Sequence, residues 1–528
     1  MKAGYLLSLA ALACSASALA TDASPAKPAP VHFTPDEVRT TGAITVGSQR
    51  IAYRTYAGTL VVHPKGWDDT APLTEKSAKP DDETALAEAA MFYTAYFKDG
   101  APSANRPVTF LFNGGPGSPS MWLHMTAFGP KRVETANAAH TPAAPYALVD
   151  NRFTLLGSSD LVFIDAPGTG FSRVMGKDKD KAFYGVDQDI HAFADFISQF
   201  LTKYGRWNAP KYVFGESYGT MRGAGLALAL QDRGIDLNGL ILLSNILNWD
   251  SMPDDPQLNP GIDTPYIVAL PTYAATAWYH KRLPQQPAEL RPFLDEVEHF
   301  ATGDYAQALI QGSDLPEAER QRIAQKLADY TGLPVPYLLK TNLRIEYGAF
   351  QKELLADQAA TTGTLDTRFA GTTLDPLSKV ASYDPTSSAT GSAAISAFND
   401  YARNTLHYGQ DRNYQTSLGV YSSWDYRHKP PGADHALIAL PNVLPDLAAT
   451  MKQNPHLKVL VLGGYYDIST PYFEGKYELR HLPIPQSLRG NIAYRYYPSG
   501  HMVYLNPAVI GDVRTDITQF IDQTDNLP

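Results

Sequence analysis

Cysteine is almost absent from this sequence, because the 528 residues contain only one, Cys14. A single thiol excludes a disulfide framework and any metal site built from several thiolates. Clustered positive charge is also missing: 44 Lys and Arg face 54 Asp and Glu, for a formal net charge of −10, and no basic run occurs. Nucleic-acid backbones are bound by clustered Lys and Arg that release counterions. The composition therefore argues against a nucleic-acid-binding protein as well as a disulfide-stapled one.

Long hydrophobic runs are scarce, and the one near the start is short. Residues 1–20 combine Lys2, an apolar stretch over residues 5–13 and the small-residue run Ala18-Leu19-Ala20. This pattern is typical of a cleaved secretory signal peptide, and a buried helix is the alternative. Cys14 lies inside the segment, after residues that fit a lipid-anchor signal poorly. No later apolar run approaches the roughly 20 residues that cross a membrane. We therefore expect a soluble protein, secreted or periplasmic, with neither a membrane span nor a lipid anchor.

Short apolar runs are the main structural signal of the chain. Residues 21–30 form a Pro/Ala linker, and the next 30 residues, rich in Val, Ile, Thr and Tyr, favour antiparallel hairpins. The short runs that follow each end in Gly, Asn, Asp or Ser, which predicts strands buried on both faces of a parallel sheet. They are residues 108–112, 161–164, 212–214, 240–243 and 459–462. In such a sheet, chemistry collects at the carboxyl ends of the strands.

Residues 258–440 have a different pattern. Apolar residues recur at the spacing of an amphipathic helix over 290–301 and again over 323–330. Residues 360–395 are rich in Thr, Ser, Gly and Ala, and we predict a loop there. The fold class is therefore α/β, with a mostly parallel central sheet and a helical cap insertion over its active edge. The predicted layout is signal peptide 1–20, linker 21–30, first core part 31–257, cap insertion 258–440 and second core part 441–528.

Residues 214–220, FGESYGT, place Ser217 in a Gly-x-Ser-x-Gly pattern. An apolar strand precedes the pattern, and a helix rich in Ala, Gly and Leu follows over residues 221–230. Glycines on both sides permit a strand-to-helix turn too tight for side chains, which lifts the serine Oγ out of the sheet. The pattern also occurs by chance in plain turns. The strand before it and the helix after it favour a nucleophile.

A nucleophilic serine needs a base, and the base needs an acid to orient it. Asp467 follows the strand predicted at 459–462, in GGYYDISTP, and His501 follows another apolar segment, in YYPSGHMVY. Both come after the serine in the order acid then histidine, as in hydrolases with this elbow. Asp165 is a competing acid, but it precedes the serine, and we interpret it as bracing a turn. The candidate catalytic residues are therefore Ser217, Asp467 and His501.

Four blocks of sequence stand in one order along nearly the whole mature chain. They are FLFNGGPGSPS at 110–120, FIDAPGTGFS at 163–172, FGESYGT at 214–220, and GYYDISTP with SGHMV at 464–471 and 499–503. Together they resemble the serine carboxypeptidase family, which has the α/β-hydrolase fold. The resemblance implies that the three candidate residues form a Ser-Asp-His triad.

The resemblance also implies roles for neighbouring residues. The backbone N–H groups of Gly115 and Tyr218 map to the family's oxyanion hole, and elbow geometry independently requires the residue after the nucleophile. Asn113, Gly114 and Glu216 match the positions that bind the substrate's terminal carboxylate. A carboxylic acid donates a hydrogen bond to a carboxylate only while protonated, and adjacent like charges raise one pKa. Binding is therefore expected to favour acidic pH. An ordinary strand-exit turn is the alternative for the segment that starts at Asn113.

The sequence departs from the family at several positions. Thr220 stands where a Gly is usual, Pro119 interrupts the Ser-rich end of its block, and Leu111 replaces a tryptophan of some members. These changes bear on side-chain preference and leave the reacting groups intact. The chain also lacks the disulfides of eukaryotic members, and the interval of 34 residues from Asp467 to His501 is short. Both features indicate a compact bacterial branch of the family.

The expected function is that of a serine carboxypeptidase that releases C-terminal amino acids through an acyl-enzyme. Its expected partners are peptides with a free C-terminus. No His or Cys cluster has ligand spacing, so neither a metal nor an organic cofactor is expected. Two alternatives stay open. An esterase or acyltransferase on the same scaffold is disfavoured by Asn113 and Glu216, and a non-catalytic binding protein is disfavoured by the complete triad.

Overall fold

The computed structural model describes residues 32–67, 87–101, 106–437 and 440–527. The predicted signal peptide, the predicted linker and Cys14 lie outside the described residues. The chain from Phe33 onward forms one unit, and the described residues build a ten-stranded sheet within it. No helix in the described part of the chain is both long and apolar enough to cross a membrane.

The sheet is antiparallel at one edge and parallel elsewhere. β1 (Glu37–Val46), β2 (Gln49–Val62) and β3 (Glu88–Lys98) pair antiparallel, which confirms the predicted hairpins, and β8 (Arg173–Met175) also pairs with β3. β3 then pairs antiparallel with the first of the parallel strands. In spatial order these are β7 (Asp160–Ile164), β4 (Val108–Phe112), β9 (Lys211–Glu216), β10 (Gly239–Leu243), β13 (Lys458–Gly464) and β14 (Ile492–Tyr497). The five apolar runs predicted as strands are thus confirmed.

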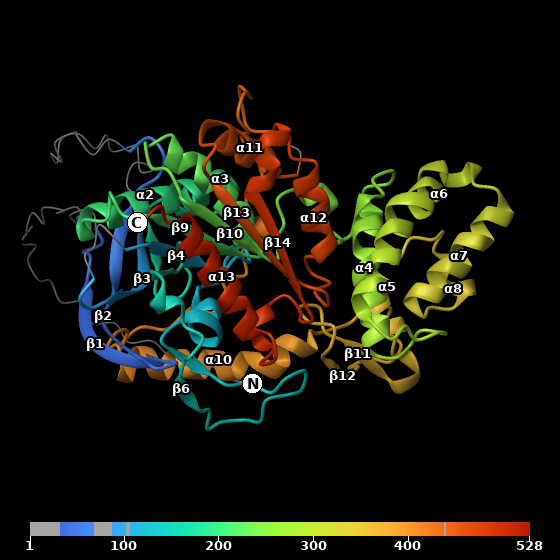
Figure 1. Ribbon diagram of the computed structural model, residues 1–528, viewed down its shortest axis with the longest axis horizontal. Coiled ribbons are helices and arrows are strands. Elements are labelled where there is room, and N and C mark those ends of the chain that lie inside the picture. The colour runs from blue at the N-terminus through green and yellow to red at the C-terminus, as the bar shows by residue number, and fades with distance from the viewer. Residues whose placement is uncertain (1–31, 68–86, 102–105, 438–439, 528) are drawn as a thin grey trace, which may run out of the picture. The chain divides into compact units, whose positions relative to one another are not determined.

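Helices cover both faces of the parallel strands (Figure 1). On one face lie α2 (Val186–Tyr204), α3 (Tyr218–Gln231) and α11 (Leu444–Gln453), and on the other lies α13 (Ile510–Thr524). Each face has its own hydrophobic core: the first core lies under α2, α3 and α11, and the second lies under α13. Along β9, Val213 packs in the first core, whereas Tyr212 and Phe214 pack in the second. Alternate residues of a strand face opposite sides, and each fully buried apolar side chain contributes about 1.5–3 kcal/mol. Two covered faces therefore require nearly continuous apolar runs.

The helices between β10 and β11 form a third core. They are α4 (Thr264–Tyr279), α5 (Leu290–Phe300), α6 (Ala306–Gln311), α7 (Glu317–Thr331), α8 (Val335–Lys340) and α9 (Tyr347–Glu353). The helices predicted over 290–301 and 323–330 are confirmed as α5 and α7. This core also contains Ile468 and Tyr472, so the helices pack on the loop after β13 and on α12 (Tyr472–Arg480), as Figure 1 shows.

The prediction of a loop over residues 360–395 is wrong. This segment contains β11 (Ala360–Thr362), β12 (Ala370–Thr372) and the start of α10 (Pro385–Asn404). The Asp384 side chain caps α10 by accepting the backbone N–H groups of Thr386 and Ser387, at 3.0 and 3.2 Å, and Pro385 occupies the first turn. Phe398 and Tyr401 of α10 pack in the second core of the sheet. Part of the predicted cap therefore covers a face of the sheet. The remaining short elements are β5 (Lys131–Val133), β6 (Leu148–Asp150) and α1 (Lys179–Phe183).

The strand order reverses at β4. β7 follows β4 in the chain and lies on one side of it, whereas β9 lies on the other side. Ligand sites of open α/β sheets form where the strand order reverses, beyond the carboxyl ends of the strands. Asn113 directly follows β4, and Ser217 directly follows β9. The topology thus brings two of the predicted site residues to the same edge.

Candidate active site

Ser217 occupies a strained turn between β9 and α3. Its backbone has φ 61° and ψ −134°, a conformation that residues with a Cβ rarely adopt. The flanking glycines are required by space, because a Cβ on Gly215 would lie 2.0 Å from the carbonyl oxygen of Gly219. The Ser217 N–H donates to the Leu243 carbonyl at the end of β10, at 2.9 Å. The turn therefore has the geometry of a nucleophile elbow.

Asp467 and His501 form a buried pair beyond β13 and β14. Asp467 Oδ2 lies 2.8 Å from His501 Nδ1. The other carboxylate oxygen, Oδ1, accepts the backbone N–H groups of Ser469 and Thr470, both at 3.0 Å. The Thr470 hydroxyl lies 2.7 Å from Asp467 Oδ2 and 3.1 Å from His501 Nδ1. Both carboxylate oxygens of Asp467 are thus hydrogen-bonded, and Oδ2 faces the imidazole of His501.

The ring of His501 is held by Asp467, and its backbone is tied to β10. Its carbonyl accepts the Ser244 hydroxyl at 2.6 Å, and Ser244 follows Leu243, which bonds to Ser217. Burial lowers the pKa of His501, but the nearby charges of Asp467 and Glu216 outweigh it and raise the pKa above its ordinary value. Among the described residues no hydrogen bond joins Ser217 Oγ to His501. Such contacts are often long in ligand-free enzymes.

Glu216 is a buried acid beside the elbow. Its two carboxylate oxygens accept the hydroxyl of Tyr504, at 3.1 and 2.8 Å. Burial raises the pKa of Glu216 to about 7, while His501, Tyr504 and Asn113 act in the opposite direction. Sequence reasoning missed Tyr504. A tyrosine three residues after the histidine was its only signal, and its partner lies 288 residues away.

The loop after β4 lies directly against the elbow. A Cβ on Gly114 would lie 2.5 Å from the backbone nitrogens of Tyr218 and Gly219, so only glycine fits there. Gly115 has φ 112°, which also favours glycine. Tyr218 is the first residue of α3, so its N–H has no carbonyl partner within the helix. The loop that contains Asn113 and Gly115 is therefore adjacent to Ser217 and to Tyr218, the other predicted oxyanion donor.

A buried cation supports this loop. Arg222 of α3 is fully buried, donates to Asp189 of α2 at 2.6 Å and donates to the backbone carbonyl of Asn113 at 2.7 Å. Thr220, which stands where the family usually has a glycine, also supports the turn. Its hydroxyl donates to the carbonyls of Ser217 and Ile246, at 2.8 and 3.0 Å. Sequence reasoning missed the role of Arg222, which a lone arginine in an apolar helix could have suggested.

Asp165, the competing acid, lies elsewhere. It accepts the N–H and the hydroxyl of Ser120, both at 2.8 Å, and the N–H of Phe171 at 3.4 Å. Burial raises its pKa to about 6, although the Ser120 bonds lower it. It braces two loops, as predicted, and makes no hydrogen bond to His501.

Aromatic side chains from the predicted insertion stand beside the elbow. Trp424 Nε1 donates to the Tyr218 hydroxyl at 3.2 Å, and Trp249 stacks on Tyr421 with ring centroids 5.9 Å apart. A Cβ on Gly117 would lie 2.9 Å from Val420. The segment around residues 418–426 therefore forms a wall against the predicted site.

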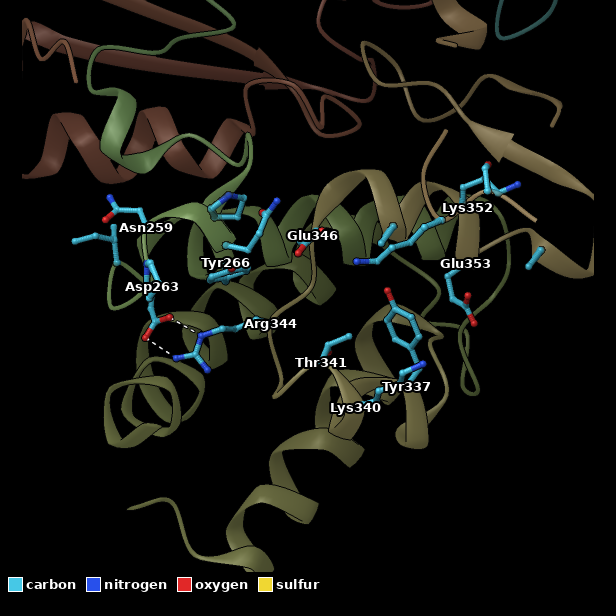
Figure 2. A pocket seen from close by; sticks show the side chains of 18 of the residues that line it. Asn259, Asp263, Tyr266, Tyr337, Lys340, Thr341, Arg344, Glu346, Lys352 and Glu353 are labelled. Atoms are coloured by element: carbon cyan, nitrogen blue, oxygen red, sulfur yellow. Dashed lines mark hydrogen bonds and ion pairs between the residues drawn. The ribbon is translucent and has the colours of Figure 1, made fainter. Parts of the chain in front are cut away.

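A cavity of about 690 Å³ lies in the helical part of the insertion. Figure 2 shows Tyr266, Tyr337 and Arg344 around it, with Arg344 paired to Asp263. None of the predicted site residues lines this cavity. It is therefore separate from the arrangement around Ser217.

Comparison with known proteins finds matches to one family over part of the chain. A model described as serine carboxypeptidase matches residues 82–247, less than half of the chain. This region contains Ser217 and the loop after β4, but neither Asp467 nor His501. The pheromone-processing carboxypeptidase KEX1 of Saccharomyces cerevisiae is 30% identical over 135 residues, which cover 25% of this chain and 17% of the yeast protein. The retinoid-inducible serine carboxypeptidase of Homo sapiens is 30% identical over 167 residues, 30% of this chain and 33% of the human protein. The matches thus span a third or less of each relative.

Solved structures of low sequence identity also align with the chain. Proline iminopeptidase of Mycobacterium smegmatis has a TM-score of 0.33 at 14% identity, covering 92% of this chain and 99% of its own. A carboxyl esterase of Bacillus coagulans has a TM-score of 0.35 at 12% identity, covering 89% and 98%. The sheet order, the helices on both faces and the elbow at Ser217 define an α/β-hydrolase fold, which confirms the predicted fold class. Within that fold, residues 82–247 are the part that matches the serine carboxypeptidase model.

Proposed function

We propose that this protein is a serine-type carboxypeptidase that removes C-terminal residues from peptides. The observation that carries the proposal is Glu216, a buried carboxyl with a pKa of about 7 next to the proposed nucleophile and electrostatically coupled to His501. Such a group gives the site a reason to select a substrate with a free terminal carboxylate, which neither an ester nor an internal peptide bond supplies. A protonated carboxyl in this place can donate a hydrogen bond to the carboxylate at the end of a peptide chain.

The proposed reaction assigns a task to each group. Ser217 Oγ attacks the carbonyl carbon of the last peptide bond, and His501 Nε2 takes the hydroxyl proton and returns it to the departing amino group. Asp467 holds the Nδ1 proton of His501 and stabilises the imidazolium. The N–H groups of Gly115 and Tyr218 stabilise the oxyanion, each worth about 100- to 1,000-fold in rate. Water then attacks the acyl-enzyme by the same proton route.

A matched pair of substrates tests the proposal. The first is a peptide with a free C-terminus, and the second is the same peptide as its C-terminal amide. We expect kcat/KM for the amide to be about 100-fold lower, because a lost hydrogen bond to a charged group costs about 1.5–3 kcal/mol. Product masses from both reactions give the measurement, with the Ser217→Ala variant as the control for contaminating peptidases. Equal cleavage of the two substrates would contradict the exopeptidase assignment and favour an esterase or acyltransferase.

The proton balance between Glu216 and His501 supports an acidic optimum. The charge of Glu216 raises the pKa of His501, and the charge of His501 lowers that of Glu216. A terminal carboxylate binds best when Glu216 is protonated, and the reaction needs a neutral His501. Protonation of Glu216 meets both conditions. The protonated carboxyl can donate to the substrate carboxylate, and it no longer carries the negative charge that raises the pKa of His501. Substrate binding therefore weakens as pH rises through about 7.

The Glu216→Gln variant tests this coupling. Glutamine keeps the shape and remains a neutral, weaker donor at every pH, so we expect weaker peptide binding chiefly at low pH and a KM that no longer rises above neutral pH. We also expect the acid limb of kcat/KM to move to lower pH, because His501 of the free enzyme loses a neighbouring negative charge. The measurement is kcat and KM from about pH 4 to 9.

Asp165→Asn is the matched control for this profile. It removes another buried acid with a raised pKa that has no bond to His501. Its KM is expected to keep the pH dependence of the wild type. A Glu216→Gln profile that overlays the wild-type profile would contradict the carboxylate-binding role.

We further propose that the enzyme acts outside the cytoplasm. Residues 1–20 support this, because they combine a positive start, an apolar stretch and small residues at the expected cleavage site.

A further inference from the structure

A short segment of the predicted insertion lies between the two loops that carry Asp467 and His501. This segment, residues 364–368, connects β11 to β12. On one side the His501 N–H donates to the Leu365 carbonyl at 2.6 Å. On the other side the Ile468 N–H donates to the Thr364 carbonyl at 3.3 Å, and the Thr367 N–H donates to the Tyr466 carbonyl at 2.9 Å. The segment therefore bonds to His501 itself and to both neighbours of Asp467.

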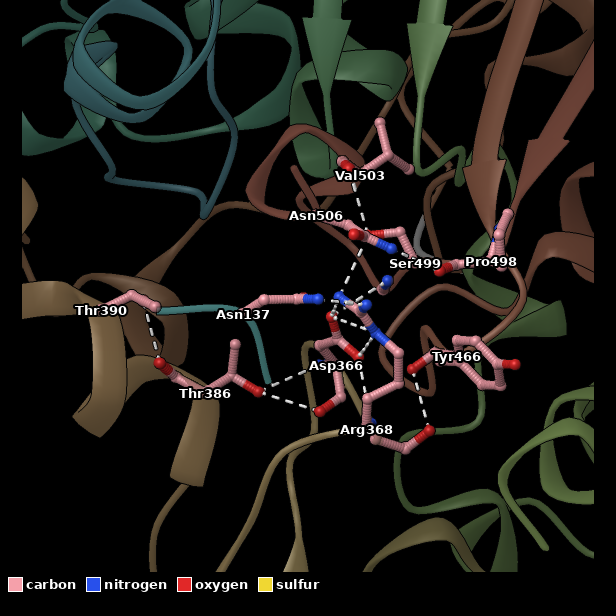
Figure 3. Close-up of polar contacts among 12 residues, drawn as sticks. Asn137, Asp366, Arg368, Thr386, Thr390, Tyr466, Pro498, Ser499, Val503 and Asn506 are labelled. Atoms are coloured by element: carbon pink, nitrogen blue, oxygen red, sulfur yellow. Dashed lines mark hydrogen bonds and ion pairs between the residues drawn. The ribbon is translucent and has the colours of Figure 1, made fainter. Parts of the chain in front are cut away.

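A buried ion pair lies at the centre of this segment (Figure 3). Asp366 is 2% exposed and Arg368 is 6% exposed, and the guanidinium bonds to both carboxylate oxygens. The Asp366 carboxylate also accepts the N–H of Gly500 at 3.2 Å, and Arg368 reaches the Ser499 hydroxyl at 3.4 Å. The pair thus contacts the two residues that immediately precede His501.

The surroundings leave the pair little freedom. A Cβ on Gly500 would lie 2.3 Å from the Cβ of Asp366, so the chain before His501 needs glycine to admit the segment. The hydroxyl of Thr386, at the start of α10, bonds to both the N–H and the carbonyl of Asp366, each at 3.1 Å. Arg368 also bonds to Asn137 at 3.2 Å. Figure 3 shows these side chains converging on Asp366 and Arg368 from separate parts of the chain.

We propose that Asp366 and Arg368 are positioning residues for His501, an inference that rests on the proposed function. Two main-chain bonds join the segments of Asp467 and His501 directly, from the Tyr465 N–H to the Tyr497 carbonyl and from the Tyr466 N–H to the Ser499 carbonyl, both at 3.0 Å. Neither bond reaches Gly500 or His501, whose N–H groups bond to Asp366 and to the Leu365 carbonyl instead. These bonds from the segment hold the backbone of His501 in the place where its Nδ1 lies 2.8 Å from Asp467 Oδ2.

The test compares two variants that damage buried Asp–Arg clusters in the same way. Arg368→Gln removes the guanidinium next to His501. Arg106→Gln removes one from the cluster of Arg106, Arg206 and Asp160, which lies at the start of β7, the end opposite to the carboxyl edge. We expect kcat of Arg368→Gln to fall by about 10- to 100-fold with KM changed by less than about 3-fold, because a small misplacement of a reacting group has this effect. The rate of fluorophosphonate labelling at Ser217 is expected to fall by the same factor.

Thermal unfolding of both variants separates positioning from stability. If the ion pair at Asp366 only stabilises the fold, both variants lose a similar amount of Tm and keep the same kcat in the cold, which overturns the inference. A milder variant, Asp366→Asn, serves if Arg368→Gln does not fold. It keeps an acceptor for the Gly500 N–H, and we expect an intermediate loss of kcat.

A spectroscopic readout keeps the inference separate from the proposed function. The proton on His501 Nδ1, held by Asp467, gives a far-downfield NMR resonance, which we expect to weaken or shift in Arg368→Gln and to persist in Arg106→Gln. An unchanged resonance in Arg368→Gln overturns the positioning role. If the wild-type protein shows this resonance but neither cleaves peptides nor reacts with a fluorophosphonate, the proposed function fails while the positioning role is still measured.

Discussion

The Ser217→Ala variant is expected to lose kcat by about a million-fold, since removal of the nucleophile disables the whole triad. Ser217 Oγ has no hydrogen bond among the described residues, so its removal leaves no partner unsatisfied. Alanine also has the same Cβ in the same strained turn. We therefore expect an unchanged Tm together with nearly complete loss of peptide hydrolysis and of fluorophosphonate labelling. The measurement is kcat on a peptide substrate and mass analysis of the labelled protein.

Ser217→Gly is the informative control for this prediction. Glycine accepts a positive φ freely, and sparsely populated backbone conformations cost about 1–3 kcal/mol for other residues. The glycine variant is therefore expected to be as inactive as the alanine variant but more stable to heat. Residual activity near the wild-type value in either variant would show that Ser217 is not the nucleophile. A Tm of Ser217→Gly below that of Ser217→Ala would show that the strain released at the elbow is smaller than the unfolded-state entropy that glycine adds.

The Asp467→Asn variant is expected to lower kcat by about 10⁴-fold, mainly because the histidine takes the wrong tautomer. The Asn oxygen can still accept the N–H groups of Ser469 and Thr470. Its amide NH₂ then replaces Oδ2 and donates to His501 Nδ1. That contact leaves the His501 proton on Nε2, so the ring cannot take the proton of Ser217. Peptide KM is expected to change little, because Asp467 does not contact the proposed carboxylate-binding residues.

Thr470→Val is the matched control for Asp467→Asn. The threonine hydroxyl bonds to the same carboxylate oxygen and lies 3.1 Å from the same ring nitrogen. Valine removes that hydroxyl and leaves the charge of Asp467 in place, so we expect a loss of only about 10-fold, in line with the lower end of the range of about 1.5–3 kcal/mol for a hydrogen bond to a charged group. Equal losses in the two variants would mean that the network around Asp467, and not its charge, supports His501.

The strands and the elbow were predictable because their signals are local. A strand buried on both faces needs an apolar residue at each position, so the runs at 108–112 and 240–243 identify β4 and β10 directly. The turn at Ser217 needs glycines on both sides for steric reasons that also show in the sequence. The order of Asp467 and His501 after the serine then limits the candidates for the other two site residues.

The helix α10 was not predictable from composition. Its buried positions are largely Ala and Thr, which carry no strong helical periodicity, and its capping residue, Asp384, lies in a segment rich in turn formers. The helix is stable because it packs on the second core through Phe398 and Tyr401. Tertiary packing thus overrides a weak local preference.

The sequence by itself determined the reactive groups: a serine on a tight turn, followed by an aspartate and a histidine in a set order. These could be predicted because steric and burial requirements act on residues that are neighbours in the chain. The partners of those groups were decided by folding alone. Tyr504 meets Glu216 across 288 positions, Arg368 meets Ser499 across 131, and Thr367 meets Tyr466 across 99. Such contacts arise when separate segments are buried against one another and their polar atoms must find partners away from water, a requirement that no local pattern records.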